Sequence, residues 1–298
     1  MSTTSSCLVL GAAAGLKPEG LDVFINSLRN TGYADSTAIV VYDSDRELAT
    51  WLKSRGVFVV AVPAPARPDN SFPSPKRISQ AGRNLPGFLR RRLIDPLAAA
   101  RLHIRFSRYL YFNRFLRRHR DEFTHVFLAD TRDIVFQADP FPALQSCDGA
   151  LCLFAEDPIR EQDFNTRCVL EFYGAGSLKS IGQQPGFCSG TTGGGTRAVL
   201  AYLDCMAREI ICKLKILHKY DYGDQAVHIW TAWAGRLPKY RVLENFNGPV
   251  ANLGIADAGR FRWNSQGLML NDDGSIIPVL HQYNRHPCLE SLVEKLAA

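Results

Sequence analysis

The chain has 298 residues, of which 46% are hydrophobic and 21% charged, and its formal net charge at pH 7 is +6. This composition excludes a largely disordered chain, and no apolar run approaches the ~20 residues that a membrane-spanning helix needs. Because no internal repeat or linker divides the sequence, we expect a single domain over residues 1–298.

The N-terminal part of the chain alternates between strand and helix patterns. Short apolar runs predict strands at 7–10, 37–42 and 57–62, and the spacing of apolar residues predicts helices at 21–29 and 47–54. Such a βαβαβ order is typical of a parallel, Rossmann-like sheet with right-handed crossovers.

The first candidate binding residues follow the first two predicted strands. Gly11 and Ala12 would let a base or ribose approach the end of the first strand, although the GxGxxG pattern of a dinucleotide site is absent. Asp43 ends the second strand and is a candidate for the same nucleotide. The polar N-terminus lacks the basic start and long apolar core of a signal peptide, so we expect a cytoplasmic protein.

A strongly basic region comes next. Residues 63–96 are rich in Pro, Gly, Ser and Arg, which predicts a long loop with one helical turn, and residues 97–118 predict a long basic helix. Such a region attracts the phosphates of nucleotides, nucleic acids or anionic lipids, and its charge alone does not distinguish among these ligands. The alternative is a helix face that is merely exposed to solvent. We expect Arg90, Arg91 and Arg92 to dock on a membrane or an acceptor. Apart from Asp95, the charged residues of this Lys76–Arg120 segment are all basic, namely Lys76, Arg77, Arg83, Arg90, Arg91, Arg92, Arg101, Arg105, Arg108, Arg114, Arg117, Arg118 and Arg120.

The most informative feature is the apolar run 125–129, which is followed by two carboxylates, Asp130 and Asp133. Its length suits a buried strand, and in an open α/β sheet ligands bind beyond the carboxyl ends of the strands. A turn would bring both carboxylates to one side, where they suit Mg²⁺ or Mn²⁺ carrying a diphosphate. The alternative is structural, with Asp130 capping a turn and Asp133 pairing with Arg132.

A glycine-rich segment, 187–195, precedes a predicted helix at 196–214. It contains Ser189, Gly190 and Thr191, whose amides and hydroxyls would be accessible at the entry to the helix. The N-terminus of a helix is a natural site for an anion or a sugar, and a plain glycine-rich loop is the alternative.

Further candidates lie in the second half of the chain. Asp224 and Gln225 open a predicted helix, where Asp224 is either an N-cap or part of a polar face toward a substrate. Glu156 follows a predicted strand, and His281 ends another and begins the polar run HQYNRH. The strands predicted in this half are 150–154, 241–243, 250–253 and 277–281.

Together these features resemble the GT-A class of nucleotide-sugar glycosyltransferases over most of the chain, from Cys7 to about Arg285. The shared pattern is a Rossmann-like start, an Asp motif after a central strand, a Ser-Gly segment, an Asp-Gln helix start and a late His. The stretch from Asp130 to Phe141 also resembles a DxRDxxFQxDPF segment of uncharacterised or polysaccharide-building enzymes. The resemblance implies an α/β GT-A fold with a mixed, mostly parallel central sheet flanked by helices.

The resemblance also implies roles for the metal-site residues. In that class, Asp residues of a DxD-type motif and a late His hold Mn²⁺ or Mg²⁺ against the donor diphosphate. These positions map onto Asp130, Asp133 and His281, although this chain has DxxD rather than DxD. Residues 1–135 would form the half that binds the nucleotide sugar, and residues 136–298 the half that binds the acceptor.

Cleavage of a sugar–diphosphate bond needs cations at the leaving group and a polar group near an oxocarbenium-like anomeric carbon. We expect Arg105 and Arg108 to contact the diphosphate. Residues expected to bind the donor are Gly11, Ala12, Asp43, Ser189, Gly190 and Thr191. Residues expected near the anomeric carbon are Asp224, Gln225 and Glu156, with Asp157 beside Glu156.

We therefore expect a metal-dependent glycosyltransferase that moves a hexose or pentose from a UDP-sugar to a glycan or lipid-linked glycan, with retention favoured by the Asp-Gln start. It would be cytoplasmic, in peripheral contact with an anionic membrane, and would have no nucleic-acid partner. One alternative is a nucleic-acid-binding protein that uses the Lys76–Arg120 segment and therefore binds in a salt-sensitive way. The other is a metal-dependent nucleotidyltransferase or phosphohydrolase that uses Asp130 and Asp133.

Overall fold

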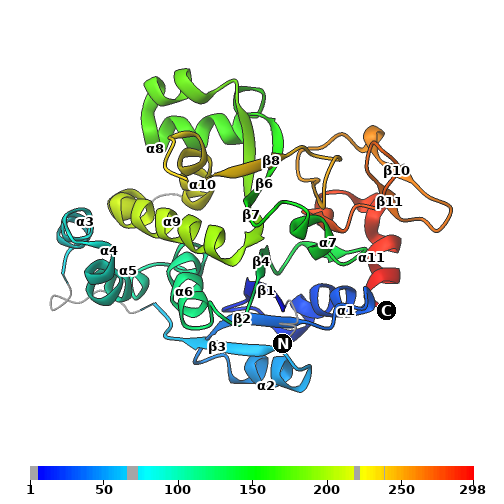
Figure 1. Cartoon of the computed structure of the whole chain (residues 1–298), viewed down its shortest axis with the longest axis horizontal. Coiled ribbons are helices and arrows are strands. Elements are labelled where there is room, and N and C mark those ends of the chain that lie inside the picture. Colours follow the sequence, from blue (N-terminus) through cyan, green and yellow to red (C-terminus); the bar gives the residue numbers. More distant parts are fainter. Residues whose placement is uncertain (1–5, 66–72, 218–221, 238) are drawn as a thin grey trace.

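A seven-stranded sheet forms the centre of the computed structural model (Figure 1), which describes residues 6–65, 73–217, 222–237 and 239–298. The strands lie in the order β3-β2-β1-β4-β7-β6-β8, and all run parallel except β7, which is antiparallel to both neighbours. The predicted α/β class and mostly parallel sheet are confirmed. The strands are β1 Cys7–Ala12, β2 Ser36–Tyr42, β3 Phe58–Val62, β4 His125–Asp130, β6 Leu151–Pro158, β7 Pro185–Gly195 and β8 Tyr240–Leu243.

Helices cover both faces of this sheet, which explains why β1, β2 and β4 are continuous apolar runs. Successive side chains of a strand point to opposite faces. Leu8 of β1 therefore packs in one buried cluster with Phe112 of α6 and Leu203 of α9, whereas Val9 packs in another with Phe24 of α1. The helices are α1 Asp22–Asn30, α2 Arg46–Ser54 and α7 Phe141–Gln145 on one face, and α6 Ile104–Arg118 and α9 Thr196–Leu217 on the other.

A small second sheet brings the late part of the chain to the end of β4. Its central strand, β12, is antiparallel to β5 and parallel to β9, and in this register His281 lies opposite Ile134 and Asn252. Helix α11 packs against α1 beside this sheet. The elements are β5 Ile134–Phe136, β9 Val250–Asn252, β12 Val279–His281, the paired strands β10 Arg262–Trp263 and β11 Met269–Leu270, and α11 Glu290–Ala297.

The prediction of a loop over 63–96 is wrong for its C-terminal part, which is helical from Pro75 to Ala99, apart from a break at Leu85 and Pro86; residues 66–72 lie outside the described residues. Ser74 caps the first helix by accepting a hydrogen bond from the amide of Arg77. The helix then buries Ile78, and its Ser79 hydroxyl donates to a carbonyl of α9. Packing against α9 thus stabilises a sequence whose composition resembles a loop. The elements are α3 Pro75–Asn84, α4 Gly87–Leu89, a π-helical segment Arg90–Ile94 and α5 Asp95–Ala99.

Two further predictions are corrected. The long helix expected over 97–118 is two helices, because α5 ends at Ala99 and α6 starts afresh with His103 as its cap. The glycine-rich segment is not a loop but the central strand β7. A side chain at Gly194 would lie 2.2 Å from the carbonyl oxygen of Ala150, so glycine lets β7 pack closely beside β6.

Two helices complete the layer beside β6 and β7. Helix α8, Asp163–Ile181, is kinked at Gly174 and has no counterpart among the predicted elements, whereas α10, Gly223–Trp233, matches its prediction. The two helices pack against each other. Within the described ranges, no helix is both long enough and apolar enough to cross a bilayer.

The structure corrects the docking role expected for Arg90, the first of the three consecutive arginines. Arg90 is only 1% exposed, and its Nε atom lies 3.1 Å from the Oδ1 atom of Asp95. Asp204 of α9 forms ion pairs with Arg90, Arg91 and Arg117. Part of the basic region therefore has a structural role, since its ion pairs with Asp204 hold its helices against α9. Buried guanidinium groups require such paired carboxylates.

The buried His228 of α10 leads to a prediction about stability. Its Nδ1 atom lies 2.7 Å from the Tyr202 hydroxyl, and burial together with the positive Arg108 lowers the pKa of the imidazole to about 3. Below pH ~6.5 the unfolded chain therefore binds a proton that the folded protein does not. We expect the free energy of unfolding to fall by up to ~1.4 kcal/mol per pH unit from this residue as the pH drops from 6.5 toward 3.

The variant His228→Gln removes this titration, so its urea-unfolding free energy should depend less steeply on pH in the same range. Wild-type and variant are compared by urea unfolding at pH 7 and pH 5. An identical loss of stability in both proteins between these pH values would contradict the assignment.

Candidate functional site

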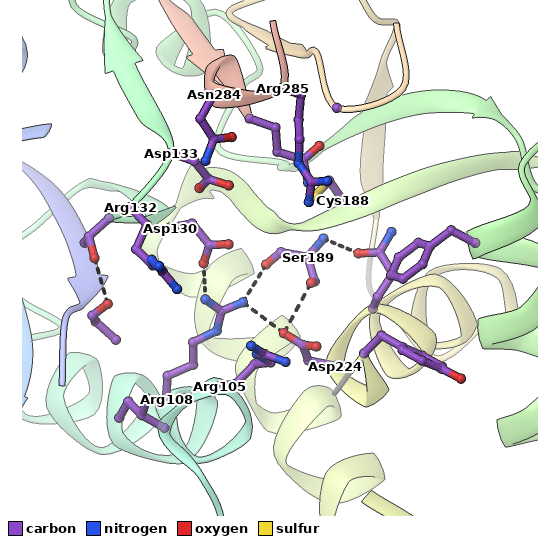
Figure 2. Close-up of a pocket in the computed structure, with 18 of the residues that line it drawn as sticks. Arg105, Arg108, Asp130, Arg132, Asp133, Cys188, Ser189, Asp224, Asn284 and Arg285 are labelled. Carbon is purple, nitrogen blue, oxygen red and sulfur yellow. Dashed lines mark hydrogen bonds and ion pairs between the residues drawn. The ribbon is translucent and has the colours of Figure 1, made fainter. Parts of the chain in front are cut away.

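A cavity of about 670 Å³ opens at the carboxyl edge of the parallel strands. The ends of β1 and β4, the start of α6, Ser189 of β7, the start of α10 and the segment from Gln282 to Arg285 line it. Figure 2 shows Arg105 and Arg108 reaching into the cavity from α6, and Asn284 and Arg285 projecting from the opposite side.

Asp130, Asp133 and His281 come together at this cavity. Asp130 ends β4, Asp133 lies in the turn before β5, and His281 ends β12. The Nε2 atom of His281 lies 3.6 Å from Oδ1 of Asp133 and 3.9 Å from Oδ2 of Asp130. One ligand atom from each of the three residues lies within 4.8 Å of the others, so the cluster has the composition and spacing of a metal site.

The orientation of the His281 ring also fits a metal ligand. The Nδ2 group of Asn252 donates to the carbonyl of Phe154, so its Oδ1 atom accepts a hydrogen bond from Nδ1 of His281, 2.9 Å away. In the neutral form of the imidazole this leaves the lone pair on Nε2, and that atom is buried and has no hydrogen-bond partner among the described residues. A side chain at Gly190 would come within 2.6 Å of the imidazole and 2.7 Å of the Asp130 carboxylate, so glycine keeps this space open.

Both structural alternatives for the Asp pair are wrong. Asp130 does not cap a turn but forms an ion pair with Arg108. Asp133 faces His281, and no ion pair joins it to Arg132, although the structure describes both residues. Burial alone would raise the pKa of Asp130, but Arg108 and His281 outweigh burial and hold that pKa below its usual range. Asp130 is therefore an ionised carboxylate at neutral pH.

Arg108 connects Asp130 to Asp224. Its Nη2 atom lies 3.1 Å from Oδ2 of Asp224 and donates to the carbonyl of Ser189. Tyr222 occupies the N-cap position of α10, so the N-cap alternative for Asp224 is wrong. Burial raises the pKa of Asp224, and the positive charge of Arg108 opposes this shift.

Gln225 and Glu156 belong to a chain of hydrogen bonds on the other side of Ser189. The Gln225 amide accepts from the Ser189 amide at 2.8 Å and donates to Asn165, which in turn donates to Glu156 at 3.1 Å. Burial raises the pKa of Glu156. Both residues line the cavity, so the three candidates Asp224, Gln225 and Glu156 converge on one wall.

Several predicted residues are not among those that line the cavity. Gly11 is paired within β1, and Asp43 is exposed beyond the end of β2. Thr191 is buried within β7, and Asp157, which does not line the cavity, accepts a hydrogen bond from the lining residue Gln162. Of the residues predicted to bind the nucleotide sugar, those in the lining are Ala12, Arg105, Arg108 and Ser189, with Gly190 directly behind the metal cluster.

The N-terminus of α9, expected to be an anion or sugar site, does not belong to the cavity. Because β7 is antiparallel to β4, Gly195 lies beside His125 at the start of β4, whereas the cavity lies at the end of β4. Helix α9 therefore begins at the opposite edge of the sheet. Only the first part of the glycine-rich segment, at Ser189 and Gly190, reaches the cavity.

The sequence analysis did not identify several other residues that line or support the cavity. Arg132 lies inside the Asp motif and Arg285 inside the late polar run, so both were visible as neighbours of predicted ligands. Asn165, Phe164 and the supporting Asn252 carried no local signal, because only tertiary pairing brings them to the site.

No protein-family model matches the chain, and a search of curated proteins found no significant match. The chemistry of the site is therefore the basis for a functional assignment.

We expect removal of one ligand to weaken metal binding. His281→Ala or Asp133→Asn should lower the affinity for Mn²⁺ at least ~10-fold, the loss that even a change outside the ligand shell typically causes. Isothermal titration of the nucleotide-free protein measures this affinity.

Asp157→Asn is the matched control, because it removes a nearby carboxylate that lies outside the cavity, and it should retain wild-type affinity. Thermal melting of each variant verifies folding. Wild-type Mn²⁺ affinity in both ligand variants would exclude the cluster as the metal site.

Proposed function

We propose that the protein is a glycosyltransferase of the GT-A type that uses a divalent metal ion and a nucleotide sugar, with a UDP-sugar as the preferred donor. The observation that carries the proposal is the convergence of Asp130, Asp133 and the unpartnered Nε2 atom of His281 at the carboxyl edge of the sheet. The cavity beside them also presents cationic side chains and two buried carboxyl groups. The cations would neutralise the diphosphate of a nucleotide sugar, and the carboxyl groups would lie near its sugar.

Asp130, Asp133 and His281 would hold the metal ion. Two carboxylates suit Mg²⁺ and Mn²⁺, and the imidazole favours a transition metal, so Mn²⁺ fits the set better than Mg²⁺. Such an ion supplies charge neutralisation at the leaving diphosphate. Asn252 would keep the imidazole in the tautomer that binds metal.

Arg105, Arg132 and Arg285 are the residues that we assign to the phosphates. All three line the cavity from different elements, and their side chains are exposed in its opening. Guanidinium groups bind phosphate oxygens in a bidentate manner. Arg108 takes a different role from the one expected, because the half-buried Asp130 and the buried Asp224 already engage it. It positions Asp130 and Asp224.

The nucleoside would lie at the end of β1. Ala12, Ala13 and Ala14 form this part of the wall, and their small side chains leave room for a flat base. This position lies within residues 1–135, the half expected to bind the donor, whereas His281 and Arg285, which we assign to the metal and the phosphates, lie in the half expected to bind the acceptor.

Asp224 is the residue that we place at the reacting sugar. It shares Arg108 with the metal ligand Asp130, so the two carboxylates lie on either side of one guanidinium. A carboxylate there stabilises positive charge on the sugar or orients the acceptor hydroxyl. Glu156 is the second choice, since its raised pKa suits a proton acceptor.

The acceptor that we favour is a glycan or a lipid-linked glycan. Phe164 lines the cavity with 42% of its surface exposed, and its ring packs edge-on against Tyr222, which also lines it. An exposed aromatic pair beside polar groups provides the apolar surface against which a sugar ring packs.

The proposal predicts metal-dependent binding of UDP and UDP-sugars. A ligand at ~100 times its Kd stabilises the folded state by about 2.7 kcal/mol, so the melting temperature should rise by several degrees with UDP and Mn²⁺ together. The shift should be much smaller without Mn²⁺ and in His281→Ala, and it should persist in Asp157→Asn.

Product analysis separates the enzymatic alternatives. Slow hydrolysis by a glycosyltransferase breaks the sugar–oxygen bond of a UDP-sugar and releases UDP, whereas a phosphohydrolase releases UMP and a sugar phosphate. A nucleotidyltransferase would release pyrophosphate from a nucleoside triphosphate. Production of UMP or pyrophosphate instead of UDP would overturn the glycosyltransferase assignment.

A second prediction concerns Asp224. Asp224→Asn should lower turnover at least ~100-fold while the donor Kd changes little, because the lost interaction would be made mainly in the transition state. Loss of its ion pair with buried Arg108 will also lower stability, so kinetics are measured well below the melting temperature. Near-normal turnover in Asp224→Asn, together with an inactive Glu156→Gln, would move the role to Glu156.

A further inference from the structure

Two large apolar side chains are exposed close together in the segment 86–96. Phe88 is 64% exposed and lies in α4, and Leu93 is 51% exposed and lies within the π-helical segment Arg90–Ile94 that follows. Short π-helical stretches within helices are rare and recur at functional sites. Burial of such side chains is favourable in proportion to their apolar area, so this segment gains free energy when an apolar phase covers it.

A cavity of about 460 Å³ adjoins this segment and is separate from the candidate active site. Arg90 and Arg91 line it from the segment, Asp204 and Arg208 line it from α9, and Arg236 lines it from the residues after α10. Four guanidinium groups therefore surround one opening that contains a single carboxylate.

The ion pairs of this cavity leave positive charge unneutralised. Asp204 is shared among Arg90, Arg91 and Arg117, and Glu209 pairs with Arg236. Neither Arg208, at the cavity, nor Arg92, on the segment beside it, forms an ion pair with any described residue, and both are exposed. Such an opening binds an anion that carries several oxygen atoms, such as a phosphate group.

We infer that this docking surface, made of Phe88, Leu93, Arg91, Arg92 and Arg208, binds an anionic membrane. Phe88 and Leu93 enter the boundary between head groups and acyl chains, and the arginines contact lipid phosphates. Apolar side chains surrounded by cationic ones are the pattern of interfacial attachment. The inference is independent of the proposed function, because none of these residues lines the active-site cavity.

The observations favour a lipid surface over a nucleic acid. Nucleic acid would account for the arginines but not for an exposed leucine beside the phenylalanine, since single strands bind through rows of stacked aromatic rings. The polypeptide also runs from the docking surface through α5 into α6, whose Arg105 lines the active-site cavity. Attachment here would hold the active site near lipid-linked substrates.

Vesicle flotation with the full chain tests the inference. Wild-type protein should float with vesicles of phosphatidylcholine and phosphatidylglycerol, and much less with phosphatidylcholine alone. The double variant Phe88→Ser/Leu93→Ser and the single variants Arg92→Glu and Arg208→Glu should each bind the anionic vesicles at least ~10-fold more weakly. All of these side chains are exposed or at the cavity opening, so the variants should fold normally.

Matched controls lie on other surfaces. Leu170→Ser changes an apolar side chain that is 44% exposed on α8, and Arg197→Glu reverses an exposed arginine at the start of α9. Both should bind vesicles like the wild type, and all variants should keep the UDP–Mn²⁺ thermal shift of the wild type, whatever its size. Equal weakening in the controls, equal binding to neutral vesicles, or binding of an RNA oligonucleotide without any vesicle binding would overturn the inference.

Discussion

The buried guanidinium of Arg108 is the interaction on which the rest of the site depends. It reaches Asp130 at the end of β4, the Ser189 carbonyl in β7 and Asp224 at the start of α10, while its own helix packs on the sheet. Removing Arg108 and Asp224 from water is costly, and mutual hydrogen bonding between them and with the half-buried Asp130 offsets that cost. If either carboxylate moved away, the buried Arg108 would lose an ion-pair partner, so the ion pairs hold Asp130 and Asp224 at a constant separation.

The sequence predicted the fold well where local pattern and tertiary environment agree. Strands β1, β2 and β4 are apolar because both faces are covered, so their composition alone identifies them. Prediction failed where packing overrides composition. The glycines of β7 suggested a loop, yet the close approach of β6 requires them, and the Pro- and Arg-rich segment before α6 is helical because α9 covers it.

The candidate site was predicted to the extent that its residues follow strand ends. Asp130, Asp133 and His281 each follow a short apolar run, and the carboxyl edge of a sheet gathers such positions. The role of Asn252 could not be predicted from the sequence, because it consists of one hydrogen bond to His281 on another strand. The sequence also could not show that Arg108 would be engaged by Asp224, since this contact joins distant segments through tertiary packing.

The attachment of β12 to the small sheet has a consequence for how the protein is made. All strands of the main sheet lie within residues 7–243, so a ribosome has synthesised the whole scaffold before it reaches His281. A nascent chain at that stage contains Arg108 and both of its carboxylate partners but only two of the three residues of the Asp130, Asp133 and His281 cluster. Because domains fold as synthesis proceeds, the cluster of Asp130, Asp133 and His281 would be completed only after the strands of the main sheet have been made.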